Sequence, residues 1–203
     1  MLTATPHGDA RIDLFEPSGK SKALLALGHG AGGGVDAPDL IAVRDASVAA
    51  GFTVALITQP YRVAGRRAPA PAAQLDAAWI AAVSFVQADL KAKKLFVGGR
   101  SAGARVACRT ASALRAAGIV ALAFPLHPPG KPDRSRADEL LSGVPTLVVN
   151  GDSDPFGVPS PSPGVEVLVI PGARHDLRKD LATVKKAVVE WVTKHTARNV
   201  RAG

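Results

Sequence analysis

Residues 95–106 read LFVGGRSAGARV, the stretch of this chain that says most about its architecture. An apolar run typical of a buried strand leads into the pattern Gly-x-Ser-x-Gly, and an alanine-rich helical pattern follows. Gly99 and Gly103 flank Ser101, and the absence of a Cβ at both positions lets the strand and the helix approach closely. We therefore expect Ser101 at a tight turn beside a helix N-terminus, where free N–H groups favour developing negative charge.

A plainer interpretation of this stretch is a glycine-rich turn whose serine only caps the following helix. The pattern is short enough to arise by chance, although a strand before it and a helix after it make a chance match rarer. Partner residues elsewhere in the chain must decide between the two interpretations.

The composition is that of a globular protein. The chain has 203 residues, 47% of them hydrophobic and 21% charged, which allows a sizeable core and excludes a long disordered protein. We expect one domain over residues 1–203, with residues 196–203 as a frayed tail. The single cysteine, Cys108, excludes an internal disulfide and fits a reducing compartment. Without a signal pattern or an apolar run of ~20 residues, the sequence predicts a cytoplasmic protein with no membrane contact.

The net charge of +8 raises the question of an anionic partner such as nucleic acid. The basic residues are spread along the chain, however, and no run interleaves them with aromatic side chains, which make up only 4%. We therefore expect no specific nucleic-acid partner, and a monomer or homodimer that acts on a small molecule.

Short apolar runs alternate with amphipathic helical patterns along the chain. Seven runs read as strands, at residues 11–15, 23–27, 53–58, 94–97, 119–124, 146–150 and 165–170. Leucine, valine and tryptophan recur at helical spacing over residues 75–90 and 181–192. Strands buried on both faces and separated by helices predict an α/β fold, with a mostly parallel sheet of about seven strands and helices on both faces.

Functional groups in such a sheet gather where loops leave the carboxyl ends of the strands. A nucleophilic serine needs a general base there, and the base needs an anionic group that orients it. His175 follows the last predicted strand, and the loop after the strand before it reads GDSDPFG at residues 151–157. Either Asp152 or Asp154 could reach an imidazole from that loop.

Four stretches, in order, resemble those of the α/β-hydrolases, and more narrowly the compact, cap-less branch similar to dienelactone hydrolases. They read GHGAGGG at residues 28–34, GRSAG at 99–103, NGDSDPFG at 150–157 and GARHDL at 172–177. The resemblance implies an α/β-hydrolase fold with no cap domain, with Ser101 as nucleophile, His175 as base and Asp154, rather than Asp152, as acid. It also implies cleavage of a small carboxylic ester, lactone or thioester through an acyl-enzyme intermediate, without a cofactor.

The glycine-rich loop after the strand at 23–27 has two interpretations. GHGAGG also fits the dinucleotide fingerprint Gly-x-Gly-x-x-Gly, but the next strand ends in Ile-Thr-Gln-Pro without the carboxylate that binds a ribose. The better interpretation is an oxyanion loop, in which the backbone N–H of Ala31 joins that of Ala102. No set of His, Cys, Asp and Glu residues has metal-ligand spacing, so we expect no metal site.

Four residues at the strand exits are candidate substrate contacts: His29, Tyr61, His127 and Phe156. The resemblance also gives His29 a part in shaping the glycine-rich loop. His127 either lines the pocket or is a solvated surface residue. His7 and His195 lie in terminal segments and are expected at the surface.

A binding or scaffold protein of the same fold, with little turnover, is the alternative function. The presence of Ser, Asp and His in order argues against it, because a scaffold has no reason to keep all three residue types.

Overall fold

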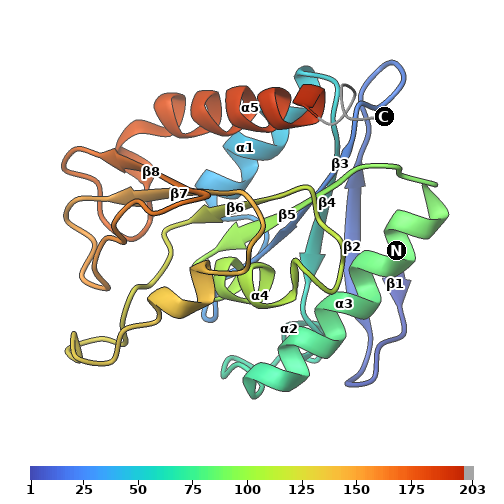
Figure 1. Cartoon of the computed structure of the whole chain (residues 1–203). Helices are drawn as coiled ribbons and strands as arrows, with labels where there is room; N and C mark the ends of the chain where they lie inside the picture. Colours follow the sequence, from blue (N-terminus) through green and yellow to red (C-terminus); the bar gives the residue numbers. More distant parts are fainter. Residues whose placement is uncertain (199–203) are drawn as a thin grey trace.

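All seven predicted strands are found in one sheet of the computed structural model, which describes residues 1–198 (Figure 1). An eighth strand, β1, has only two residues, too few to leave a periodic pattern in the sequence. The strands are β1 (Leu2–Thr3), β2 (Ala10–Phe15), β3 (Leu24–Gly28), β4 (Thr53–Thr58), β5 (Leu95–Arg100), β6 (Gly118–Leu122), β7 (Thr146–Gly151) and β8 (Val165–Ile170).

The sheet is mostly parallel, as predicted. Its strand order is β1-β2-β4-β3-β5-β6-β7-β8, and only β1 and β2 pair in the antiparallel sense. Since β3 to β8 run in one direction, their carboxyl ends meet at one edge. The register there pairs Gly28 of β3 with Gly99 of β5, which brings the glycine-rich loop next to the turn that carries Ser101.

Helices cover both faces of the sheet. They are α1 (Pro38–Ala49), α2 (Pro60–Val63), α3 (Ala72–Asp89), α4 (Ala102–Thr110) and α5 (Leu181–Arg198), with short 3₁₀ turns η1 (Ala137–Leu140) and η2 (Arg178–Asp180). Figure 1 shows α1 and α5 on one side of the sheet and α3 and α4 on the other.

The alternation of side chains along each strand creates two cores. In β3, Leu25 and Leu27 pack in a cluster with side chains of α1 and α5, whereas Leu24 and Ala26 pack with α3 and α4. Continuous apolar runs were therefore the correct signal for these strands, because both faces of the sheet are covered. Among the described residues no segment forms a separate cap domain, and the connection from β6 to β7 carries only η1.

The end of the chain differs from the prediction. His195 is buried, with 8% of its surface exposed, because its ring stacks on Trp191 at 4.0 Å and its Nδ1 lies 2.9 Å from the Trp191 carbonyl oxygen. The expectation of a surface histidine was therefore wrong. Residues 196–198 continue α5, and the rest of the predicted tail, residues 199–203, lies outside the described residues. No helix in residues 1–198 has the length and apolar character needed to span a bilayer.

Candidate active site

Ser101 occupies a strained turn between β5 and α4. Its backbone has φ 54° and ψ −112°, a region that side-chain-bearing residues rarely adopt, and its N–H donates to the Leu122 carbonyl at 2.9 Å. A Cβ on Gly99 would stand 2.4 Å from the Gly28 carbonyl oxygen, and a Cβ on Gly103 would stand 2.5 Å from the same atom. The turn thus needs both glycines, because β3 passes directly against it.

The hydroxyl of Ser101 does not cap α4 and contacts a histidine instead. Ser101 Oγ lies 2.9 Å from His175 Nε2, and His175 Nδ1 lies 2.8 Å from Asp154 Oδ2. The carboxylate accepts from Nδ1–H, which leaves Nε2 free to accept the serine proton. Asp154 is held in place by Phe156, whose N–H donates to Oδ1 at 2.9 Å.

Asp152 lies on the same loop, is exposed and bonds groups other than the His175 ring. Its Oδ1 accepts from Gly172 N–H at 2.7 Å and from the Ser153 hydroxyl at 2.9 Å. The bond from Gly172 is the main reason why the pKa of Asp152 lies below its usual value. Of the two carboxylates that the sequence left open, the structure brings Asp154 to the imidazole.

The glycine-rich loop lies beside Ser101 and is fixed by His29. A Cβ on Gly30 would stand 3.5 Å from Ser101 Cβ. His29 is buried; its Nε2 accepts from Gln59 N–H at 3.0 Å, so its Nδ1 carries the proton and donates to the Gly30 carbonyl at 2.8 Å. That carbonyl shares a planar peptide with Ala31 N–H, and the bond therefore sets the direction of this N–H. Burial lowers the pKa of His29, which keeps the ring neutral.

Tyr61 supports the next peptide of the same loop. Its hydroxyl donates to the Ala31 carbonyl at 2.8 Å, and its ring is buried. The polar atoms of His29 and Tyr61 thus support the glycine-rich loop, and both residues also line a small cavity beside Ala102, so their contact with substrate stays a prediction. Within residues 1–198, neither Ala31 N–H nor Ala102 N–H donates to another atom, so two backbone donors stay free beside Ser101.

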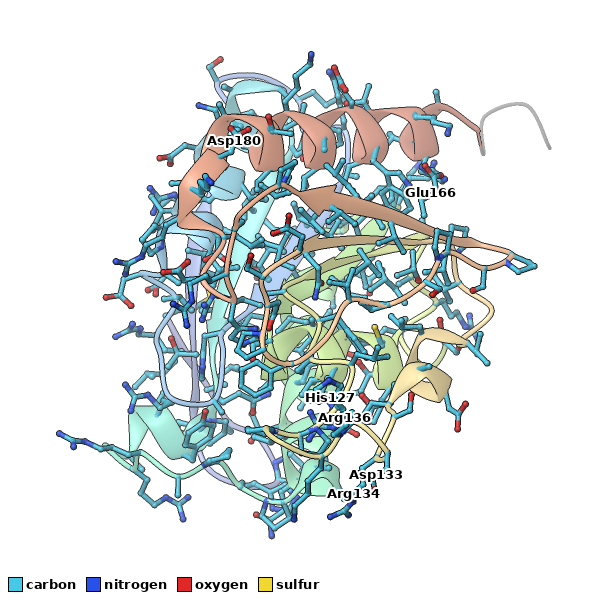
Figure 2. All side chains as sticks on the ribbon, turned by 90° about the vertical axis from the view of Figure 1, so that its left-hand side faces the viewer. His127, Asp133, Arg134, Arg136, Glu166 and Asp180 are labelled. Carbon is cyan, nitrogen blue, oxygen red and sulfur yellow. The ribbon has the colours of Figure 1, made fainter. Side chains whose placement is uncertain are left out.

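The two remaining candidate contacts, Phe156 and His127, lie on the other side of the site. The Phe156 ring packs on the His175 ring with 4.3 Å between centroids. His127 contacts Phe156 from another loop, where its backbone N–H donates to the Phe156 carbonyl at 3.1 Å. Figure 2 shows His127 close to Arg136, and Arg136 N–H donates to the Leu126 carbonyl at 2.7 Å. Phe156 therefore borders the histidine directly, and His127 is half-buried at the rim.

The cavity next to the serine turn is small. A cavity lined by Ala102, Gly103 and Tyr61 has a volume of only about 10 Å³. A larger cavity of about 400 Å³ lies at the amino ends of β3 and β4, beside Leu24 and Thr53, and so at the opposite edge of the sheet. In the part of the chain that the structure describes, no group of three or more His, Cys, Asp or Glu side chains could hold a metal ion.

Two residues that hold the site together were missed by the sequence reasoning. Asn150 is buried at the end of β7, where its side chain bonds both the N–H and the carbonyl of Phe124, at 2.8 and 3.0 Å, and the Gly157 carbonyl at 3.2 Å. Arg100 donates from Nη2 to the His175 carbonyl at 2.9 Å. Both positions were quoted within motifs, but a motif does not show which distant backbone groups a side chain will reach.

A mostly parallel sheet with a serine at the β5–α4 turn defines the class of α/β-hydrolases. The chain belongs to the family described as alpha/beta hydrolase domain, whose model matches residues 21–200. The predicted fold and the hydrolase class are thereby confirmed. No curated protein matches the chain.

Solved structures with the same fold include cap-less enzymes. An α/β serine hydrolase without lid from Xanthomonas campestris is 19% identical, with a TM-score of 0.76 over 96% of this chain and 93% of that one. Dienelactone hydrolase from Anabaena variabilis is 19% identical, with a TM-score of 0.73 over 96% and 95%. Est1E from Butyrivibrio proteoclasticus with ferulic acid bound is 16% identical, with a TM-score of 0.78 over 98% and 100%. The likeness supports the predicted resemblance to the cap-less, dienelactone-hydrolase-like branch.

Proposed function

We propose that this protein is a serine hydrolase that cleaves small carboxylic esters, lactones or thioesters through an acyl-enzyme intermediate. The observation that carries the proposal is the unbroken hydrogen-bonded series from Ser101 Oγ through His175 to the buried Asp154, with distances of 2.9 and 2.8 Å. This is the arrangement in which a hydroxyl loses its proton to an imidazole while it attacks.

The reaction proceeds in two halves. His175 Nε2 takes the proton of Ser101 as Oγ attacks the substrate carbonyl carbon, and the Asp154 carboxylate stabilises the imidazolium that forms. His175 then gives this proton to the departing alcohol or thiol, and the acyl group stays on Oγ. In the second half His175 removes a proton from water, which attacks the acyl-enzyme, and the proton returns to Oγ as the acid leaves.

The two free backbone donors beside Ser101 stabilise the tetrahedral intermediate in this proposal. Ala31 N–H and Ala102 N–H bind the negative oxygen, and Ala102 also brings the positive end of the α4 dipole. The bonds from His29 and Tyr61 to the loop carbonyls at 2.8 Å support this, because they hold the Ala31 peptide before substrate arrives.

The substrate is small or extended in this proposal, because no segment of the described residues forms a cap domain. Phe156 offers an apolar surface beside His175, and His127 lies next to it at the rim. Est1E, which shares the fold, has been solved with ferulic acid, a compact aromatic acid. We propose that this protein acts on a substrate of comparable size.

Hydrolysis of p-nitrophenyl acetate by a pair of serine variants tests the proposal. We expect Ser101→Ala to lower kcat by about 10⁴-fold or more, because the nucleophile is lost. Ser153→Ala is the matched control, since the Ser153 hydroxyl bonds the exposed Asp152 and its loss should leave native turnover. Equal activity of the native protein and Ser101→Ala would contradict the proposal in favour of a binding or scaffold role.

A further inference from the structure

Arg100, the residue before Ser101, makes a contact that its place in the sequence does not explain. Its Nη2 donates to the His175 carbonyl at 2.9 Å, and its Nε lies 3.0 Å from Asp39 Oδ2. Its Nη1 is close to the glycine-rich loop, 3.3 Å from the position of a Cβ on Gly30. One guanidinium thus contacts the histidine loop and α1, and it lies close to the glycine-rich loop.

The partner of Arg100 on α1 is a fully buried carboxylate. Asp39 has no exposed surface, and within residues 1–198 Arg100 is the only cation within 4 Å of it. Its Oδ1 accepts from Leu40 N–H at 3.0 Å. Burial raises the pKa of Asp39, while the charge of Arg100 opposes this change. Buried ion pairs of this kind often contribute no more stability than an apolar pair of similar size, so stability alone is a weak reason for the pair.

The His175 backbone depends on this arginine. Among the described residues, the bond from Arg100 is the only hydrogen bond made by the main chain of His175. Arg100 is the chain neighbour of Ser101, so its bond to the His175 carbonyl ties the backbone of His175 to the backbone next to Ser101. Ser101 Oγ and His175 Nε2 are the atoms that lie 2.9 Å apart. A change in the position of the His175 backbone would alter that distance directly.

We propose that Arg100, anchored by Asp39, is a positioning residue that holds His175 at the right distance from Ser101. This inference rests on the proposed function. The planar guanidinium suits the task, because its fixed fork of donors can contact a carboxylate and a carbonyl at the same time, which the single ammonium of lysine does less well. A displacement of about 1 Å between reacting groups can cost about 10²-fold in rate.

The test is the rate at which a fluorophosphonate modifies Ser101 in a charge-free double variant, Asp39→Asn with Arg100→Met. The double change leaves no buried charge without a partner, and the amide oxygen of the introduced asparagine keeps an acceptor for Leu40 N–H. We expect the second-order rate constant of labelling to fall at least about tenfold. With p-nitrophenyl acetate, kcat should fall by the same factor as the labelling rate constant, while KM stays within about twofold. The labelling rate constant is measured per folded molecule. A loss of folded protein would therefore not lower it.

Arg105→Met with Glu139→Gln is the matched control. It removes another partly buried arginine–carboxylate pair, whose atoms lie 2.6 Å apart, while Arg109, the second partner of Glu139, keeps its pair with Asp76. We expect native labelling rates there at a comparable melting temperature. If the double variant does not fold, Arg100→Lys replaces it in the test, because lysine still provides a positive charge beside Asp39. We expect this variant to be labelled more slowly than the native protein.

The outcomes separate the two proposals. A native protein that is not labelled would overturn the proposed function itself. A native protein that is labelled, together with native rates in the double variant or in Arg100→Lys, would overturn the role of Arg100 and leave the proposed function standing.

Discussion

Two aspartates two positions apart in one loop have opposite environments. Asp154 is buried against His175 Nδ1 at 2.8 Å, whereas Asp152 is exposed and bonds Gly172 N–H. We predict that Asp154→Asn lowers kcat for p-nitrophenyl acetate by up to ~10⁴-fold, because an amide no longer holds the tautomer or stabilises the imidazolium. Asp152→Asn, with the melting temperature of both variants measured, should stay within a few-fold of native. Severe loss in Asp152→Asn alone would refute the assignment.

His29 makes folding stability sensitive to acid. Burial lowers its pKa in the folded protein from the ordinary value of 6.5, so the unfolded chain binds a proton more readily. The contribution of His29 is therefore present above about pH 6.5 and is lost as the pH falls from there toward its folded pKa. We predict that urea denaturation shows a smaller loss of stability between pH 7.5 and pH 5 in His29→Gln than in the native protein. An unchanged difference would argue against a buried neutral His29.

The sequence predicted some residues of the site well and others poorly. Ser101 and His175 follow from motif and chain order, whereas the choice of Asp154 needed the family resemblance, because spacing alone allows both carboxylates. His29 and Tyr61 were placed near the site, yet their hydrogen bonds to the loop carbonyls depend on the folded backbone. The pairing of Asp39 with Arg100 left no signal, since the two residues are far apart in the sequence and meet only when the first turn of α1 comes close to the end of β5.

At the level of elements, β3, β5 and α4 meet in a tight junction. A Cβ on Gly103 would meet three backbone atoms, at 2.5, 2.6 and 2.9 Å, and none of these can rotate away. We predict that Gly103→Ala destabilises the protein by about 1–3 kcal/mol, because overpacking outweighs the ~1 kcal/mol that alanine gains in a helix. Gly19→Ala is the control in urea denaturation, since nothing lies within 4 Å of its Cβ. Gly103→Ala of native stability would show that the junction can relax.

The elements themselves were largely predictable, and their limits have a physical reason. Buried parallel strands leave continuous apolar runs, so β2 to β8 were found with ends displaced by only a few residues. β1 was missed because two residues carry no period. α1 was not predicted individually, and its buried face includes the charged Asp39, which breaks the apolar stripe by which helices are recognised.

The whole molecule lacks a cap over Ser101 within its described residues, and this sets the range of acyl chains. Without a cap segment to enclose a long acyl chain, methylenes beyond the first few stay in water and contribute little of the ~0.8 kcal/mol that each would give if buried. We predict that p-nitrophenyl acetate or butyrate is cleaved at least about tenfold faster in kcat/KM than the palmitate ester. A preference for palmitate would show that the rim loops or a second subunit form a tunnel.

The layered architecture was predictable as a whole because parallel strands separated by helices allow few arrangements. The same topology explains why residues far apart in the sequence form one site, since each follows a strand that ends at the same edge. His195 shows the limit: a terminal segment suggests exposure, but one face of α5, with Trp191, Val192 and His195, is buried. A single domain over 1–203, a cytoplasmic location and the oligomeric state stay predictions.

The central claim, that Ser101 is an activated nucleophile, is tested most directly by labelling the native protein with a fluorophosphonate at neutral pH. Peptide mapping by mass spectrometry then locates the adduct. We predict one phosphonylated residue, Ser101, with no labelling of Ser101→Ala or of the urea-unfolded chain, because the reactivity depends on His175 Nε2 at 2.9 Å. A folded native protein that stays unlabelled, or is labelled at another residue, would contradict it.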